Sequence, residues 1–407
     1  MSMFKYLAER FEFRIFLVVI ALVILGIVSV YSASYDAQAS EIFFKQLVWA
    51  ALGVGVLLLC AFVPFRILHL SAYPAYALSI ALLVGVLLFG RTVSGSTSWF
   101  NLGTLRFQPS EFAKVTTALA LAAYLSRPDV TLAKVKHLFV VAGMVLLPVL
   151  LIMAQPDTGT AVIYVVMLFP VLYWGGASKF TLLAIVAPGV VAVAALLGTT
   201  PFFIVVIGMG ILLYLTRENR IVTAAVFSLM VLVGISTQSI YEGLRPYQQK
   251  RIAAFLDPSV DPLGAGYNVV QSKVAIGSGG LLGKGYLQGT QTQLNFIPEQ
   301  WTDFIFCVPA EEFGFLGAAT VLVLFALLLL RGIAIGTAVK SPFASFVAIG
   351  ICGFIGAHVL INIGMSLDLL PVIGIPLPFL SYGGSALLSG MMMMGILMNL
   401  YANRKEH

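Results

Sequence analysis

Long apolar segments recur from one end of the chain to the other and constrain its fold more than any other feature. The first, FRIFLVVIALVILGIVSVYS, begins at Phe13, and no small-residue cleavage pattern follows it, so we expect it to remain as a helix. A bilayer core of roughly 30 Å requires about 20 apolar residues in each helix that crosses it. Because 60% of the 407 residues are hydrophobic and only 10% are charged, the chain is predicted to be a polytopic membrane protein.

Hydropathy predicts one all-α membrane domain over residues 1–407, built as a helix bundle. The twelve expected helices cover residues 14–32, 46–63, 72–89, 109–125, 138–154, 160–176, 180–198, 202–216, 221–239, 309–330, 343–365 and 382–401. The LLGTTPFF stretch could mark a kink instead of a turn, and merging two helices there would reverse all later topology. The basic TRENR stretch and the basic C-terminal tail favour two separate helices.

Basic residues are concentrated on one side of this topology. Short loops outside the cytoplasm hold only Lys45, Arg91 and Arg106, whereas the cytoplasmic loops and tail hold Arg66, Arg127, Lys134, Lys136, Lys179, Arg217, Arg220, Arg331, Lys340, Arg404 and Lys405. The positive-inside rule therefore predicts that both termini lie in the cytoplasm. Because the net charge of +6 is spread over loops between helices, we expect no nucleic-acid partner.

Cysteines and histidines give no sign of a disulfide framework or a metal centre. Cys60, Cys307 and Cys352 are odd in number, far apart and placed in or beside apolar runs. The four histidines lack the spacing of metal ligands. We therefore expect the cysteines to pack between helices, and no zinc site.

Residues 240–308 form one long polar loop, which the topology places outside the cytoplasm. A loop of this length without a role is uncommon. The glycines of GSGGLLGKG permit close backbone approach and positive φ angles, so this stretch could cradle a pyrophosphate or could be a flexible loop. It is not a Walker motif, because the flanking strand and helix are missing. The cations of this loop are Arg245, Lys250, Arg251, Lys273 and Lys284.

Five motifs of the chain resemble those of the SEDS family (shape, elongation, division and sporulation), in matching order from end to end. They are LGTLRFQPSEFAKV, QPDTGTA, DPLGAGYNVVQSKVAIGSGGLLGKG, GTQTQLNFIPEQWTDFIF and PVIGIPLPFLSYGGS. The AIGSGGLLGKG and GTQ sequences resemble those of the elongation (RodA-like) branch of that family. The resemblance implies a peptidoglycan glycosyltransferase of the bacterial cytoplasmic membrane that polymerises lipid II on the outer face. The sequence leaves open whether a divalent cation takes part.

The same resemblance implies partners. The expected one is a class B penicillin-binding protein, a transpeptidase that crosslinks the glycan strands, together with other membrane proteins of the elongation complex. From the family, contacts are expected on the tenth and eleventh predicted helices and on the outside loop.

Three features depart from the family pattern. The family usually has ten helices, and the additional pair here lies at about residues 200–239. Trp301 replaces a common His before TDF, so no imidazole role carries over to that position. Ser98 replaces a usual Arg, which removes one expected phosphate contact.

Asp303 is a carboxylate directly ahead of an apolar run. From the residues alone it could cap the following helix, since Asp and Thr favour helix N-termini. The resemblance places the family's proposed catalytic aspartate here, which implies a general base that takes a proton from the acceptor sugar hydroxyl. A carboxyl with a reference pKa of about 3.9 is too acidic for this task at neutral pH unless burial or a neighbouring carboxylate raises the value.

Further polar residues are expected to bind the substrate near the outer surface. Glu111 and Lys114 are three residues apart, so they share one helix face, and Lys114 resembles the family's functionally important lysine. Asp157 could cap a helix or line the central cavity. Arg106 is also matched by the family, and weaker candidates are the loop cations Arg245, Lys273 and Lys284.

The GIPLPFLSYGGS segment, residues 374–385, combines prolines, glycines and hydroxyls at membrane depth. Non-helical backbone at that depth must be buried or line a cavity, so the segment either shapes the lipid II site or closes the bundle.

The competing function is that of a lipid II flippase, which would also need buried charges and broken helices. A flippase should carry charged groups along its inner half, whereas Arg106, Glu111, Lys114, Asp157 and Asp303 all map to the outer third. The sequence therefore favours the enzyme.

Overall fold

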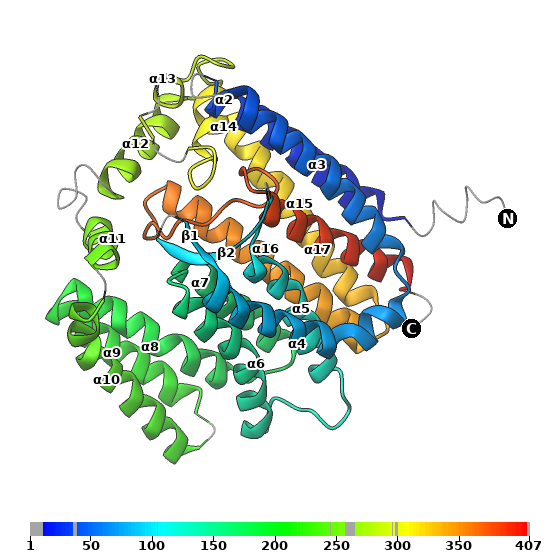
Figure 1. Ribbon diagram of the computed structural model, residues 1–407. Helices are drawn as coiled ribbons and strands as arrows, with labels where there is room; N and C mark the ends of the chain where they lie inside the picture. Colours follow the sequence, from blue (N-terminus) through cyan, green and yellow to red (C-terminus); the bar gives the residue numbers. More distant parts are fainter. Residues whose placement is uncertain are drawn as a thin grey trace. The chain divides into compact units, whose positions relative to one another are not determined.

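The computed structural model confirms an all-α helix bundle (Figure 1). It describes residues 11–35, 39–93, 95–103, 105–217, 219–244, 246–256, 265–294, 296–297 and 300–404. Helices cover most of each of the twelve segments predicted as helices. Apolar runs of this length fold as helices because every backbone N–H and C=O then has a partner inside its own segment.

The bounds of the helices in these segments are α2 (Phe13–Ala33), α3 (Ala39–Phe62), α4 (Phe65–Phe89), α5 (Pro109–Leu125), α6 (Val135–Ala154), α7 (Thr158–Trp174), α8 (Lys179–Leu197), α9 (Thr199–Leu215), α10 (Arg220–Glu242), α15 (Gly314–Ala338), α16 (Pro342–Ser366) and α17 (Gly384–Ala402). Most helix bounds lie within about three residues of the predicted ones, but α3 and α4 begin seven residues earlier than predicted and α15 ends eight residues later. In the described part of the chain, nine helices are long and apolar enough to cross a membrane, and α7 and α9 are shorter apolar helices.

The segment predicted as a long outside loop, residues 240–308, is largely helical where it is described. It contains α11 (Pro246–Leu256), α12 (Ala265–Ser278) and α13 (Thr290–Gln293). The predicted helix at 309–330 is also different, because a short helix α14 (Cys307–Glu312) precedes α15. The break falls at Gly314, whose φ of 63° lies in the left-handed region that favours glycine.

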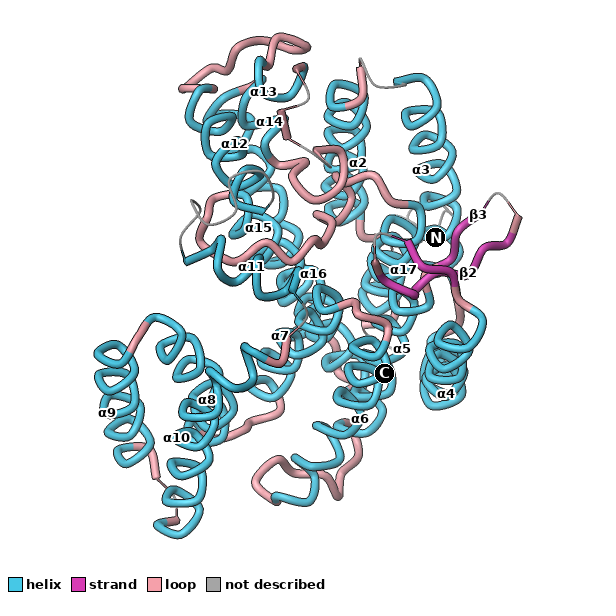
Figure 2. The backbone as a smooth tube through the Cα atoms, turned by 60° about the vertical axis from the view of Figure 1, so that its left-hand side comes forward, coloured by secondary structure: helices cyan, strands magenta, loops and turns pink. Residues whose placement is uncertain are grey.

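A small antiparallel sheet lies where only a loop was expected. Its strands are β1 (Arg91–Val93), β2 (Ser96–Leu102) and β3 (Leu105–Phe107), in the order β1-β2-β3. Figure 2 shows β2 and β3 beyond the end of α4. The Ser96 hydroxyl donates to the carbonyl of Gln155 at 2.8 Å, which fixes the sheet to the turn between α6 and α7.

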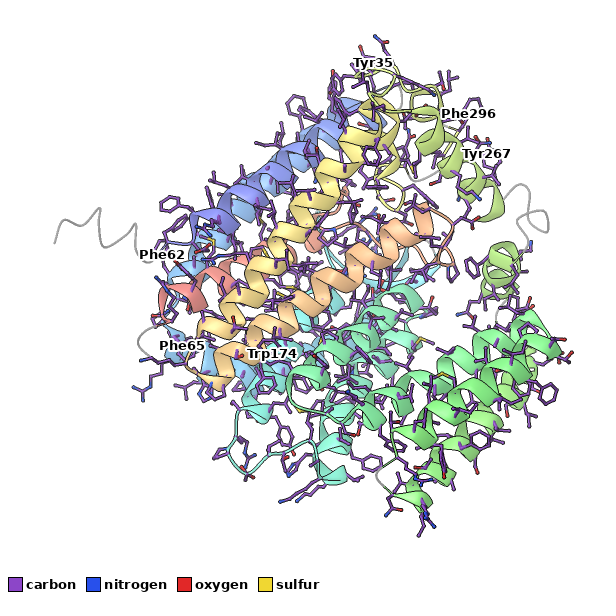
Figure 3. All side chains as sticks on the ribbon, turned by 180° about the vertical axis from the view of Figure 1, so that it is seen from behind. Tyr35, Phe62, Phe65, Trp174, Tyr267 and Phe296 are labelled. Carbon is purple, nitrogen blue, oxygen red and sulfur yellow. The ribbon has the colours of Figure 1, made fainter. Side chains whose placement is uncertain are left out.

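The chain divides into two compact units. The first comprises Met1–Thr131, Val135–Val171 and Asn268–His407. Its centre is formed by α5, α16 and α17, whose residues are mostly buried. Helix α17 packs on α3, and helix α5 packs on both α4 and α16. Figure 3 labels Phe62, the last residue of α3, and Tyr35, which lies shortly before α3, far apart on this unit.

The second unit comprises Leu132–Lys134 and Leu172–Tyr267. In it, α8, α9 and α10 pack on one another. Their shared core includes Ala187, Val191, Val206, Leu213 and Met230. The whole predicted additional pair, residues 200–239, therefore belongs to a helical unit with its own apolar core.

Candidate active site

A buried ion pair occupies the first turns of α5. The Nζ atom of Lys114 lies 2.7 Å from Oε2 of Glu111, and the two side chains are only 2% and 4% exposed. The Ser389 hydroxyl, from α17, donates to the same Glu111 oxygen at 2.7 Å. Pro109 suits the first turn of α5 because it lacks an N–H that would need a partner there. The predicted proximity of Glu111 and Lys114 on one helix face is confirmed.

His358 extends this pair to α16. Its Nε2 lies 2.9 Å from Lys114 Nζ, and its Nδ1 lies 3.1 Å from the carbonyl oxygen of Pro376. A carbonyl can only accept, so we assign the proton to Nδ1, which leaves Nε2 to accept from the lysine ammonium. The ammonium thus has a carboxylate and an imidazole as partners, as a buried cation requires.

A small cavity lies beside these groups, with a volume of about 20 Å³, enough for a water molecule. It is lined by Glu111, Lys114, Phe354, Ile355, His358, Pro376, Pro378, Ala386, Ser389, Gly390 and Met393. The cavity thus combines an apolar wall with one charged pair. The 374–385 segment contributes two of its prolines, so the segment lines a cavity as well as closing the bundle.

Asp303 lies in a turn that precedes α14. The N-cap of α14 is Phe306, which makes no side-chain cap, and Asp303 lies three residues before it. The backbone of its segment is held by three contacts: Tyr382 N donates to Trp301 O at 2.8 Å, the Ser381 hydroxyl donates to Thr302 O, and the Asn362 amide donates to Asp303 O at 2.8 Å. Asp303 itself is half-buried, whereas Phe304 and Ile305 are fully buried.

Asp157 caps α7. Its Oδ1 accepts from the Thr160 N–H at 3.0 Å, and its Oδ2 accepts from the Thr160 hydroxyl at 2.8 Å and from the Gln108 amide at 3.2 Å. Burial raises the pKa of the Asp157 carboxyl, although the bonds from Thr160 oppose that shift. Of the two roles considered for Asp157, the structure supports capping, and Gln108 links it to the start of α5.

The outer cations are not gathered around Lys114. Arg106 is exposed on β3, Lys273 lies 3.0 Å from Asp368, and Lys284 lies 2.7 Å from Glu311. Arg245 lies outside the described residues. A substrate role for any of the four stays a prediction.

The glycine-rich stretch packs directly on α14. A Cβ atom on Gly279 would overlap the carbonyl oxygen of Ala310, and one on Gly283 would overlap that of Glu312. The structure therefore assigns close backbone packing to these glycines, and a pyrophosphate cradle stays a prediction.

Sequence reasoning missed two buried carboxylates in α14. Glu311 accepts from Lys284 and from the amides of Gln291 and Thr292, at 2.7 to 3.0 Å. Burial alone would raise the pKa of Glu311, but these donors lower it on balance. Glu312 accepts from the Ser32 hydroxyl and the Leu287 amide, and burial raises its pKa. The AEEF sequence, two acidic residues followed by an apolar run, is the pattern that could have indicated them.

Within the described ranges, no group of three or more His, Cys, Asp or Glu side chains could hold a metal ion.

Comparison with known proteins gives consistent matches. A peptidoglycan glycosyltransferase from Escherichia coli K12, MrdB, is 36% identical, with 96% of this chain and 93% of that protein covered. The peptidoglycan glycosyltransferase RodA of Treponema pallidum is 34% identical, with 97% and 98% covered. A solved structure described as a peptidoglycan synthase complex that coordinates polymerization and crosslinking matches with a TM-score of 0.73 and 32% identity, over 98% of this chain and 99% of that one.

The family model of the FtsW, RodA and SpoVE cell cycle proteins matches residues 13–204 and 183–406. The two stretches overlap over residues 183–204, which lie in α8 and the start of α9, close to the predicted additional helices. Together they cover nearly all of the chain, so this protein belongs to the FtsW/RodA/SpoVE family of cell cycle proteins.

Proposed function

We propose that this protein is a peptidoglycan glycosyltransferase of cell-wall elongation. It joins the disaccharide-pentapeptide units of lipid II into glycan strands and releases undecaprenyl pyrophosphate. The full-length relatives that carry this activity in their names support the proposal. So does the site: α16 contacts both the buried Lys114 cluster, through His358, and the Asp303 segment, through Asn362.

Asp303 is the general base in this proposal. It takes the proton of the acceptor sugar hydroxyl as that oxygen forms a bond to the anomeric carbon of the donor. The bond between this carbon and the pyrophosphate breaks, and its electron pair leaves on the pyrophosphate. A positioned base typically contributes about 10² to 10⁴ in rate. The half-buried position of Asp303, next to a fully buried Phe304, supports this role because it limits competition from water.

Lys114 stabilises the departing pyrophosphate. Its ammonium is 2% exposed and already engaged by Glu111 and His358, so the donor reaches it only when the adjacent cavity widens. The pyrophosphate then neutralises part of the Lys114 charge that the Glu111 carboxylate neutralises in its absence. A charge held by prearranged partners in a site that excludes water stabilises a leaving anion more strongly than one in water.

The reaction takes place at the outer face of the cytoplasmic membrane of a bacterium. The chain crosses that membrane twelve times, with both termini in the cytoplasm, as the distribution of basic loops predicts. The extracytoplasmic side then contains Asp303, the small sheet and α11 to α13. As an even-numbered insertion, the additional helix pair preserves this arrangement.

The protein works with a class B penicillin-binding protein, which crosslinks the strands. The similar structure is described as a synthase complex that coordinates polymerization with crosslinking, which supports such a pair. Co-purification in mild detergent should recover both proteins. Full activity alone, with no partner recovered, would argue against the pairing.

One experiment separates the enzyme from a lipid II flippase. Purified protein in liposomes receives fluorescent lipid II, and both polymer on a gel and movement of label between leaflets are measured. The enzyme makes polymer without moving lipid II. Transfer of label between leaflets, with no polymer under any condition including added partner, would establish the flippase instead.

A further inference from the structure

A stripe of three polar residues follows one face of α16. His358, Asn362 and Ser366 are four residues apart, so they lie one above another on the helix. Their exposed fractions are 6%, 0% and 0%, although the rest of the helix is mostly apolar. Buried polar side chains of this kind need partners. His358 and Asn362 bond to residues outside α16, and Ser366 bonds to the preceding turn of the helix.

Asn362 makes the connection to Asp303. Its Nδ2 donates to Asp303 O at 2.8 Å and to Ile375 O at 2.7 Å, so both hydrogens of the amide are used. No protein group within the described residues bonds to its Oδ1. Two bonds in different directions fix the orientation of the amide, and they hold the Asp303 backbone against the 374–385 segment.

The neighbouring positions of the stripe fix the helix itself. One turn before Asn362, His358 contacts Lys114 and Pro376. One turn after it, the Ser366 hydroxyl donates to Asn362 O at 2.9 Å, and Ser366 O accepts from the Ser272 hydroxyl of α12. The same helix face therefore contacts the lysine cluster, the aspartate segment and α12.

We propose that Asn362 is a positioning residue for Asp303, an inference that rests on the general-base role given to Asp303 above. Asn362 fixes the distance between the carboxylate and the Lys114 cluster, because one rigid helix carries both Asn362 and His358. Without the amide, the backbone carbonyl of Asp303, the residue that carries the carboxylate, loses the hydrogen bond from Asn362. A displacement of about 1 Å can reduce a catalytic rate about 10²-fold.

Asn399 on α17 offers a matched control. It is also an asparagine, is 1% exposed, and donates through Nδ2 to backbone carbonyls of Cys60, Ala61 and Val63. It lies fifteen residues beyond Gly384, the first residue of α17, which corresponds to about 22 Å along a helix. Replacing either asparagine by alanine leaves buried carbonyls without a donor, but only one of them contacts the Asp303 segment.

The experiment compares steady-state polymerisation by the wild type, Asn362→Ala and Asn399→Ala, each with a thermal-unfolding curve. We expect Asn362→Ala to lower kcat about 10²-fold with the KM for lipid II within about threefold of wild type. Asn399→Ala should lose a similar amount of thermal stability and keep kcat within about threefold. If Asn362→Ala does not fold, Asn362→Ser, which keeps one donor, should still lower kcat about tenfold.

Equal kcat values for the two alanine variants would overturn the positioning role, as would a rise in KM alone. The same would follow from a kcat near that of wild type for a folded Asn362→Ser. Failure of the proposed function gives a different result, because the wild type itself would then make no polymer. A kcat that falls in Asn362→Ala but not in Asp303→Asn would show that Asn362 acts on something other than the aspartate, and would also overturn the inference.

Discussion

The ammonium of Lys114 lies 2.7 Å from the carboxylate of Glu111, and almost none of either side chain reaches solvent. Such a pair seldom adds stability compared with an apolar pair of similar volume, but removing one partner leaves an uncompensated buried charge. A chemical role for this pair beside the cavity stays a prediction, and substitution separates that role from the effect on stability.

Lys114→Met should destabilise the protein by about 3–5 kcal/mol, because Glu111 then remains buried without its cation. Glu111→Gln combined with Lys114→Met should recover most of this loss, since both charges are gone. We expect neither variant to make glycan polymer at an appreciable rate. Thermal unfolding and gel-resolved polymer measure the two effects, and wild-type polymerisation by the double variant would make the pair purely structural.

Asp157→Asn should be well tolerated. Asparagine also caps helices, so the bond from the Thr160 N–H survives, whereas Asp157→Ala should lose about 1 kcal/mol of stability. The Asn variant should retain more polymerase activity than any Lys114 variant. Loss of all polymer by Asp157→Asn, at an unchanged melting temperature, would instead place Asp157 in the chemistry.

Gly283→Ala should disturb the packing on α14. The new methyl group would overlap Glu312 O, and the φ of 81° is unfavourable for alanine, so we expect a cost of about 1–3 kcal/mol or more. Gly280→Ala is the control: its φ of 56° is also positive, but nothing lies within 4 Å of the new methyl group. If both substitutions shift the melting temperature equally, backbone strain rather than packing explains the effect.

The topology can be tested by labelling with an impermeant thiol reagent. Thr199 and Leu282 are exposed and are predicted to lie outside the cytoplasm. In a Cys60→Ser background, cysteines at these two sites should react from outside, whereas one at Asn219 should react only after permeabilisation. Labelling of Asn219 in intact cells would contradict the twelve-helix topology.

The fold was largely predictable because apolar run length alone determines where a helix can span a bilayer. The helices α11 to α13 within the expected loop, the break before α15 and the small sheet were not predicted. The interruption at Gly314 depends on a positive φ angle that allows close packing on residues 281–283, a contact that local hydropathy does not contain. The sheet at residues 91–107 was missed because its strands are too short to register in a hydropathy profile.

In the site, only contacts between residues close together in the sequence could be predicted. Glu111 and Lys114 are one turn apart on α5, so their contact follows from helix geometry. The contacts of His358 with Lys114 and of Asn362 with Asp303 join residues 244 and 59 positions apart. No periodicity within one segment contains such information, although three polar residues at four-residue intervals in the apolar run of α16 were a visible signal.

Asp303→Asn tests the central claim most directly. The amide keeps the size of the carboxylate but cannot take up the proton of the acceptor hydroxyl. Base catalysis typically contributes about 10² to 10⁴ in rate, so purified Asp303→Asn should fold, bind the partner protein and make essentially no polymer from labelled lipid II on a gel. Near-normal polymerisation by this variant, at a melting temperature equal to that of wild type, would contradict the assignment of Asp303 as the general base.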